Sequence, residues 1–396
     1  MTQQASSKLS LQLILILGAI AALTPFAIDM YLPAMPNIAK DFLVSSGAVQ
    51  VTLTAYTAGF AFGQLIHGPL ADSYGRRPML IAGTVSFLVL TILGALSTNI
   101  TELTIVRVAQ GFAGAAAAVI IGALVRDMFE REEFSRTMSF VTLVMTIAPL
   151  IAPVLGGHLS VWFGWRAVFW ALAIFAVIVL VSILFKIKET LPKEKRIPFH
   201  LSSIIKNYKR LLSNPVAFGL VCCSGFSFAG MFTFLTAGSF VYIDIYGVSV
   251  ENFGYYFCLN ILCMILFTSI NGRFVKRKGT HWMLRFGLAI QLTAGVLLFI
   301  GQWLGLGLWG VVIPVALFIG TLSTIGSNTM ACLLSSYPQM AGTASSLGGT
   351  FRFGIGSIVG GLVALMPDSN AWPMALTMTS CAILSAGFYW FLARTA

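Results

Sequence analysis

The chain alternates long apolar runs with short polar connections. A run of roughly 20 apolar residues is long enough for a helix to cross about 30 Å of hydrocarbon. Twelve such runs follow one another: 11–28, 48–66, 79–97, 103–125, 137–157, 166–185, 215–240, 253–271, 283–301, 304–330, 343–366 and 372–393. No cleavage site ahead of a polar domain follows the first run, so we interpret it as a span and not a signal peptide. The pattern predicts an all-α integral membrane protein with twelve transmembrane helices.

Composition supports this prediction. Hydrophobic residues make up 58% of the chain and charged residues 9%, whereas soluble proteins carry about a quarter charged residues. The six cysteines lie within the runs or at their ends, with no Cys-x-x-Cys pair and no cluster with the four histidines. We therefore expect them to pack as small apolar residues, and we expect no metal site and no cofactor.

The basic residues predict the orientation of the chain. All but four of the 24 lysines and arginines fall on one side of the predicted topology. Of the four, Lys40 and Arg166 lie on the other side, and Arg107 and Arg352 lie within spans. Because cytoplasmic loops are enriched in lysine and arginine, this places both termini in the cytoplasm. The net charge of +11 is then a topology signal, and we expect no nucleic-acid partner.

The longest polar stretch divides the twelve spans into six and six. It starts at Lys186 with "KIKETLPKEKRIPFHLSSIIKNYKRLL", and it predicts an N-terminal half over 1–188, a basic linker over 189–213 and a C-terminal half over 214–396. The last part of the linker has apolar residues at helical spacing opposite lysines. Such a segment fits an amphipathic helix on the membrane surface and equally a basic linker with some helix.

The two halves repeat one another. One offset of 204 residues joins four sets of residues: Gly68 with Gly272, Gly75 with Gly279, Met79-Leu80 with Met283-Leu284, and Gly156-Gly157 with Gly360-Gly361. A duplicated six-span unit is typical of secondary transporters, whose substrate sites lie at the interface of the repeats.

Four stretches resemble a known family. "GPLADSYGRRP" (68–78) resembles the loop 2–3 signature of the major facilitator superfamily, and "LTIVRVAQGFAGAA" (103–116) resembles its fourth-span signature. "APLIAPVLGG" (148–157) resembles the fifth-span signature of antiporters, with Pro149, Pro153, Gly156 and Gly157 in place. "FAIDMYLPAMP" (26–36), with "FSFAGMFTFL" and "AGTASSLGGTFRFGIGS", is similar to the bicyclomycin-resistance branch of drug/proton antiporters. The resemblance covers essentially the whole chain.

This resemblance implies two six-helix halves and a proton-coupled multidrug efflux antiporter in the bacterial inner membrane. Such a protein exports small drugs, including bicyclomycin-like antibiotics, by alternating access, is driven by the proton gradient and acts as a monomer. The alternatives are an exporter of an amino acid, a sugar or another small metabolite, and an uptake symporter. No metalloprotease, hydrolase or phosphate-binding motif occurs, so we expect neither an enzyme nor direct use of ATP.

The loop motif is predicted to be a conformational latch. Glycine suits Gly68 and Gly75 because the backbone must bend or approach closely there. Asp72 is placed where its negative charge can face the positive N-terminal end of another helix or pair with a nearby arginine. The resemblance implies that this helix is span 11. A contact present in only one packing of the halves would bias their rocking. Alternatively, Arg76 and Arg77 only fix the topology.

Spans 2 and 11 each carry a pair of small residues four positions apart, Gly59 with Gly63 and Gly356 with Gly360. Such pairs let helices approach closely in lipid. The sequence therefore predicts close packing of these two spans across the moving interface.

Two ionisable residues share a predicted depth in the membrane. Asp29 lies near the end of the first span and Arg107 near the beginning of the fourth, and the resemblance places these spans side by side. A carboxylate whose charge depends on pairing with an arginine is suited to proton coupling. The alternative is that Asp29 is hydrated at a helix end and that Arg107 bonds carbonyl groups.

The second half has candidate substrate residues. Arg352 lies near the middle of span 11, with no acidic residue of that half at its depth. It is expected to face water, where it contacts a polar or anionic substrate, bridges to the first half or bonds carbonyl groups. Met231 and Phe232 are candidates for an adaptable apolar wall, although lipid contact and packing also explain such residues.

Overall fold

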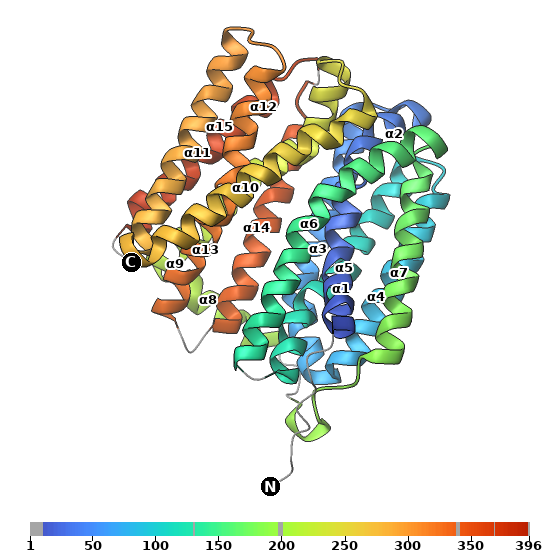
Figure 1. Cartoon of the computed structure of the whole chain (residues 1–396), viewed down its shortest axis with the longest axis vertical. Coiled ribbons are helices and arrows are strands. Elements are labelled where there is room, and N and C mark those ends of the chain that lie inside the picture. Colours follow the sequence, from blue (N-terminus) through green and yellow to red (C-terminus); the bar gives the residue numbers. More distant parts are fainter. Residues whose placement is uncertain (1–10, 130, 197–200, 338–340, 368, 395–396) are drawn as a thin grey trace.

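The computed structural model describes residues 11–129, 131–196, 201–337, 341–367 and 369–394. Within these ranges every regular element is helical (Figure 1). The N-terminal half holds these elements: α1 (Leu11–Asp29), η1 (Leu32–Ala34), α2 (Met35–Phe42), α3 (Ser46–Tyr74), α4 (Arg76–Leu96), α5 (Ile100–Met128), α6 (Arg131–Phe163) and α7 (Arg166–Lys186).

The C-terminal half follows a short connection that contains η2 (Lys193–Lys195) and α8 (Leu201–Leu212). Its elements are α9 (Pro215–Phe240), η3 (Val241–Ile245), α10 (Val250–Lys278), α11 (Thr280–Trp303), α12 (Trp309–Gly320), α13 (Leu322–Ser336), α14 (Ala341–Ala364), α15 (Trp372–Phe388) and η5 (Tyr389–Ala393). The exact division at 188 and 214 stays a prediction.

Eleven helical segments of the described chain are long and apolar enough to cross a membrane. The twelfth span is α3, which is less apolar because it contains Gln50 and several threonines. Three of these threonines, Thr52, Thr54 and Thr57, donate their hydroxyl groups to carbonyls of their own helix. Polar residues are tolerated on α3 because it is packed against α5 and α14 inside the bundle. The predicted all-α fold with twelve transmembrane helices is confirmed.

Two spans are interrupted. The first ends as α1 at Asp29 and continues as η1 and α2, because Pro33 and Pro36 lack the N–H that a continuous helix needs. The run 304–330 was expected to be one helix, but the structure breaks it at Thr321 into α12 and α13. The hydroxyl of Thr321 donates to the carbonyl of Phe318 at 2.9 Å, which supplies a local alternative to the helical hydrogen bond.

The repeat found in the sequence is visible in the backbone. Gly75 joins α3 to α4 with a φ of 107°, and Gly279 joins α10 to α11 with a φ of 85°. Both conformations are strained for residues that have a Cβ atom. Equivalent positions of the halves therefore need glycine for the same reason.

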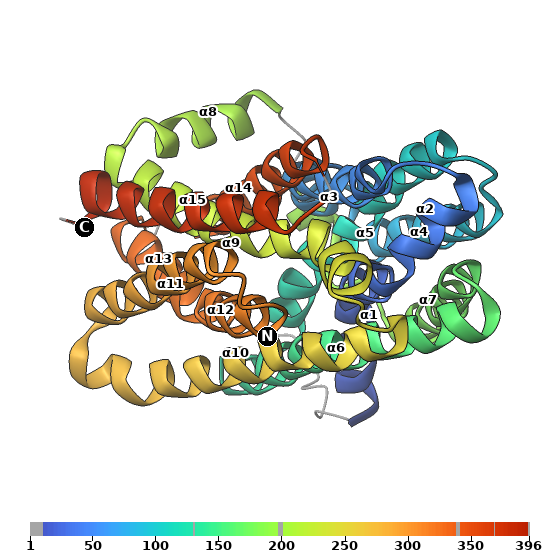
Figure 2. The ribbon, with the colours of Figure 1, turned by 90° about the horizontal axis from the view of Figure 1, so that it is seen from above.

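The halves lie side by side, with α3 against α14 and α6 against α10 (Figure 2). We call the face where α3 ends and α4 begins the basic face, and the other end of the bundle the opposite face. At the opposite face Lys40 of α2 lies 3.9 Å from Asp244 of η3, in the other half. Gly47 and Gly157 lie there against the carbonyls of Ala364 and Val250. These contacts hold the two halves together at the opposite face.

Candidate functional site

Arg107 is enclosed within the N-terminal half. It lies in the second turn of α5 and is fully buried. Its Nη1 donates to the carbonyl oxygen of Ala27 in α1 at 3.1 Å and to Oε1 of Gln110 at 2.9 Å. The amide of Gln110 in turn donates to the hydroxyl of Thr91 in α4 at 2.8 Å. One guanidinium therefore connects α1, α4 and α5.

Two tyrosine rings enclose the same guanidinium. Its central carbon lies 4.4 Å from the ring centroids of both Tyr31 and Tyr56. A desolvated arginine gains roughly 2 kcal/mol from such a ring. Nε and Nη2 of Arg107 have no hydrogen-bond acceptor among the described residues, and the rings replace acceptors. The cation is thus held at a depth where an uncompensated charge is costly.

Asp29 is the last residue of α1 and is 6% exposed. Among the described residues it has neither an ion-pair partner within 4.0 Å nor a hydrogen-bond partner for its side chain. The expected direct pair with Arg107 is therefore absent from this arrangement, because Arg107 instead reaches the carbonyl two positions earlier on α1. Of the two expectations for Arg107, carbonyl bonding is the one observed. Asp29 does lie at a helix end, as the alternative expected, and its side chain is mostly buried; its role in proton coupling stays a prediction.

The antiporter motif lies between Asp29 and the other half. Pro149 and Pro153 are inside α6. A Cβ atom added at Gly156 would lie 2.8 Å from Cα of Met30, the residue after Asp29. A Cβ atom added at Gly157 would lie 2.7 Å from the carbonyl oxygen of Val250 in α10. The two glycines thus allow α6 to touch the end of α1 on one side and the C-terminal half on the other.

The loop motif is bonded into its own half. Asp72 pairs with Arg76 one turn later at 2.5 Å, and Nε of Arg76 lies 3.3 Å from Asp127 at the end of α5. The carboxylate of Glu189, after α7, accepts the backbone N–H groups of Arg76 at 3.0 Å and Arg77 at 3.3 Å. Glu189 therefore caps the N-terminus of α4, where a negative charge is favourable.

The two glycines of the loop motif differ. Gly75 needs its positive φ. Gly68, in contrast, is inside α3, and a Cβ atom there would meet only a methyl group of Val119 at 3.4 Å, an ordinary contact. The expected need for glycine is therefore wrong for Gly68. The expected contact of Asp72 with the start of α14 involves 338–340 and the side chains of 341–343, which lie outside the described residues, and it stays a prediction.

A cavity of about 310 Å³ lies within the C-terminal half. Arg352 of α14 lines it, with Nε donating to the hydroxyl of Ser224 at 2.6 Å and Nη2 to the carbonyl of Gly326 at 3.2 Å. Met231 also lines it. Phe232 does not: it is buried, and its ring packs against Gly356. Phe232 is therefore not part of the wall of this cavity, and its place in a substrate wall stays a prediction.

Comparison with known proteins decides the family. The sequence profile of the Major Facilitator Superfamily matches residues 17–361. The chain belongs to this superfamily. A bicyclomycin resistance protein homolog of Haemophilus influenzae is 44% identical over 96% of this chain and 95% of its own. Multidrug resistance protein D of Escherichia coli is 27% identical over 95% of this chain and 94% of its own. A D-xylose–proton symporter of known structure matches with a TM-score of 0.73 and 16% identity, covering 95% of this chain and 97% of its own.

In this major facilitator protein the small-residue pairs do not act as expected. Cβ atoms at Gly59 and Gly63 would run into α5, the first against the backbone of Val108 and the second 2.7 Å from the carbonyl of Phe112. Gly356 faces α9. These three glycines thus serve packing within one half. Gly360 alone of the four meets the facing span, where a Cβ atom would lie 2.7 Å from a methyl group of Thr54 in α3.

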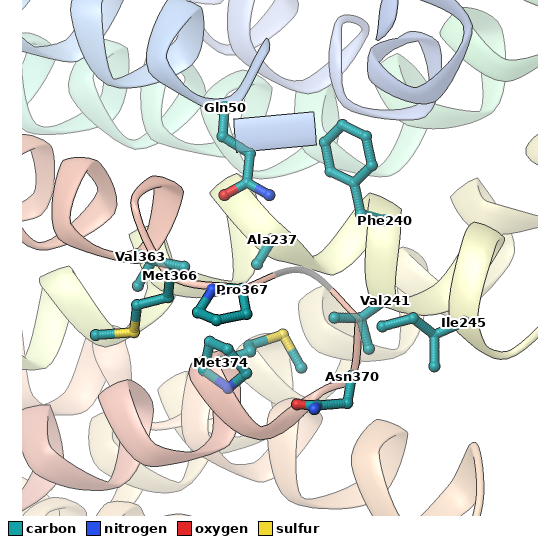
Figure 3. A pocket seen from close by; sticks show the side chains of 11 residues that line it. Gln50, Ala237, Phe240, Val241, Ile245, Val363, Met366, Pro367, Asn370 and Met374 are labelled. Carbon is teal, nitrogen blue, oxygen red and sulfur yellow. The ribbon is translucent and has the colours of Figure 1, made fainter. Parts of the chain in front are cut away.

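A second, smaller hollow lies at the opposite face of the transporter (Figure 3). It has a volume of about 20 Å³, enough for a single water molecule. The side chain of Gln50, from α3, points toward it from one half, and Phe240 and Asn370 line it from the other. Oε1 of Gln50 is buried without a hydrogen-bond partner among the described residues. This hollow is too small for a drug.

Sequence reasoning missed several residues of these sites. Tyr31 stands in the quoted "FAIDMYLPAMP" stretch, and Gln110 follows Arg107 by three positions, which puts it on the same helix face. Both could have been found from spacing. Glu189 could not, because nothing in a lysine-rich linker indicates that one carboxylate folds back onto α4.

Proposed function

We propose that this protein is a proton-coupled antiporter that exports small drugs across the bacterial inner membrane. The names of its relatives support drug export. The observation that carries proton coupling is Asp29, a buried carboxylate with no partner among the described residues. It ends a broken helix, two positions after the carbonyl that Arg107 binds. We take the basic face to be cytoplasmic, with both termini there, and the protein to act as a monomer.

Burial gives Asp29 two states of very different cost. In the present arrangement an ionised, unpaired carboxylate would cost several kcal/mol, so Asp29 carries a proton here. Separation of the halves at the opposite face would release Gly157 of α6 from Val250 of α10, and α6 could then shift at the neighbouring Gly156, which touches Met30. Water would then reach the end of α1, and proton exchange would become possible. Arg107, fixed to the carbonyl of Ala27, supplies the positive charge that stabilises the ionised form.

The same movement couples the proton to the drug. The antiporter motif touches the Asp29 end of α1 and the C-terminal half at neighbouring glycines. A change in the packing of α6 on α10 therefore alters the surroundings of Asp29. This is a two-state element that both protonation and drug binding bias. The loop motif, whose Arg76 and Arg77 begin the helix that Glu189 caps, is proposed as the latch at the basic face.

One titrating carboxylate sets the driving force. Exchange of one neutral drug molecule for one proton moves one elementary charge. Each 100 mV of membrane potential then contributes about 2.3 kcal/mol.

Inside-out proteoliposomes test the proposal. With an acidic lumen, the wild-type protein should concentrate radiolabelled chloramphenicol inside the vesicles and move protons from the lumen to the outside. Asp29→Asn should abolish accumulation while preserving downhill chloramphenicol exchange. The control is Glu102→Gln, because Glu102 is an exposed residue of α5, the helix that also contains Arg107. This variant should behave as wild type. Accumulation by Asp29→Asn that still follows the pH gradient would place the proton site elsewhere.

A metabolite exporter is the second candidate, and Arg352 is the observation that favours it. A cavity with one arginine also suits the carboxylate of an amino acid. Replacing chloramphenicol with a mixture of labelled amino acids in the same vesicles separates the two functions.

A further inference from the structure

The cavity of the C-terminal half has a wall with two kinds of side chain. Ser224, Ser227, Phe228 and Met231 line it from α9. Their spacing of three, four and seven residues puts them on one face of the helix. The serines form a polar strip, and the phenylalanine and methionine form an apolar strip beside it.

The polar strip is arranged to donate hydrogen bonds. The hydroxyl oxygen of Ser224 accepts from Nε of Arg352 at 2.6 Å, and that of Ser227 accepts from Nε2 of Gln291 at 2.8 Å. Both serines are more than nine-tenths buried. Neither hydroxyl hydrogen has an acceptor among the described residues, so each remains available to a molecule in the cavity.

Arg352 gives the cavity a positive charge. It forms no ion pair with any acidic residue of the described chain, and no aspartate or glutamate lines the cavity. Nε and Nη2 are bonded to Ser224 and Gly326, which fix the side chain in place. Its Nη1 makes no hydrogen bond to the described residues and is free for a ligand. A held guanidinium with a spare donor binds oxygen acceptors and repels cations.

The apolar strip matches the body of a small organic molecule. Phe228 and Met231 of α9 line the cavity together with Met264 of α10. Methionine side chains adapt to irregular shapes. The volume of about 310 Å³ is at the lower end of the range for small-molecule sites. The cavity therefore suits one compact ligand with an apolar side and an oxygen-rich side.

We propose that this cavity is a drug subsite for neutral or anionic molecules rich in hydrogen-bond acceptors, and that Arg352, Ser224 and Ser227 select these molecules over cationic drugs. The inference rests on the proposed function as a drug exporter and names its substrate class. In this proposal the oxygen-rich side of the ligand accepts hydrogen bonds from the serines of α9 and from Arg352 of α14.

Ligand in this subsite is also connected to the other half. Phe228 lies 5.2 Å, between ring centroids, from Phe353, the neighbour of Arg352. Phe353 lies 4.4 Å from Phe60 of α3, across the interface between the halves. A molecule that displaces Phe228 therefore disturbs a ring that both halves share.

Binding to purified protein in lipid nanodiscs tests the subsite. The probes are radiolabelled chloramphenicol, which is neutral and oxygen-rich, and ethidium, a permanent cation. Loss of a hydrogen bond from a charged donor predicts that Arg352→Gln weakens chloramphenicol binding about 10- to 100-fold. Ethidium binding should stay unchanged or become tighter. Ser227→Ala, which leaves the arginine in place, should weaken chloramphenicol about 2- to 10-fold.

Arg273→Gln is the matched control, because Arg273 is an exposed residue of α10 outside the cavity lining; it should bind both probes as wild type does. Equal weakening of both probes by Arg352→Gln and by Ser227→Ala would overturn the subsite, as would no change in either. If the subsite is overturned in this way but the wild-type protein still exports drug, the proposed function is unaffected. Failure of the wild type to transport either probe would overturn the proposed function itself, and this inference with it.

Discussion

Gly156 provides the sharpest test of how the antiporter motif works. A Cβ atom at this position would lie 2.8 Å from both Cα and the carbonyl carbon of Met30, and closer still to the carbonyl oxygen. Ordinary contact begins at 3.4 Å. Gly156→Ala therefore requires the backbone beside Asp29 to move by about 0.6 Å or more, the difference between these distances.

The magnitude follows from which atoms must move. Overpacking in a well-packed core costs about 1–3 kcal/mol. The cost is toward the upper end of this range when the added atom meets backbone, because backbone cannot rotate away as a side chain can. The intrinsic gain of alanine over glycine in a helix, about 0.5–1 kcal/mol, offsets part of this. We expect a net destabilisation of about 1–2 kcal/mol. We also expect weaker drug accumulation in a pH gradient, because the displaced residue adjoins Asp29.

Unfolding of the purified protein in detergent measures the first effect, and inside-out proteoliposomes measure the second. Gly122→Ala is the control, because a Cβ atom at Gly122 in α5 would meet no atom within 4 Å; it should be as stable as wild type or slightly more stable. If Gly156→Ala and Gly122→Ala unfold alike and accumulate drug alike, the close contact with Met30 has no role in coupling.

Two further outcomes are expected. Gly59→Ala should destabilise the N-terminal half by about 1–3 kcal/mol, since the added atom would meet α5; nanodisc distance measurements between spin labels on α3 and α14 should show no specific loss of closure, and such a loss would restore the interface role for this glycine. Glu189→Gln should lower thermal stability by about 1 kcal/mol through weaker capping of α4, in a salt-dependent way; Glu194→Gln, an exposed neighbour, should change nothing, and equal effects of the two would contradict the cap.

The sequence by itself determined the spans, the family and where the unusual residues stand. Apolar runs give helix positions because the bilayer demands a minimum apolar length. The structure moves their ends by a few residues, continues the first span past Asp29 as η1 and α2, and breaks the run 304–330 at Thr321. The need for glycine at Gly75 could also be predicted, since a tight turn between two spans favours a positive φ. These properties are local, so local pattern was enough.

The tertiary structure alone decided which helix face meets which neighbour. Gly59 faces α5 and not α14, Arg107 reaches Ala27 and not Asp29, and Glu189 folds back onto α4. In water, polar residues would mark the outer face of each helix. In a bilayer the lipid-facing and the buried faces of a helix are both apolar. The hydrophobic pattern therefore does not predict which face of the helix turns toward its neighbours. Rotation is fixed by the packing of small against large side chains between helices far apart in the chain, and that packing determines the partners of the charged residues.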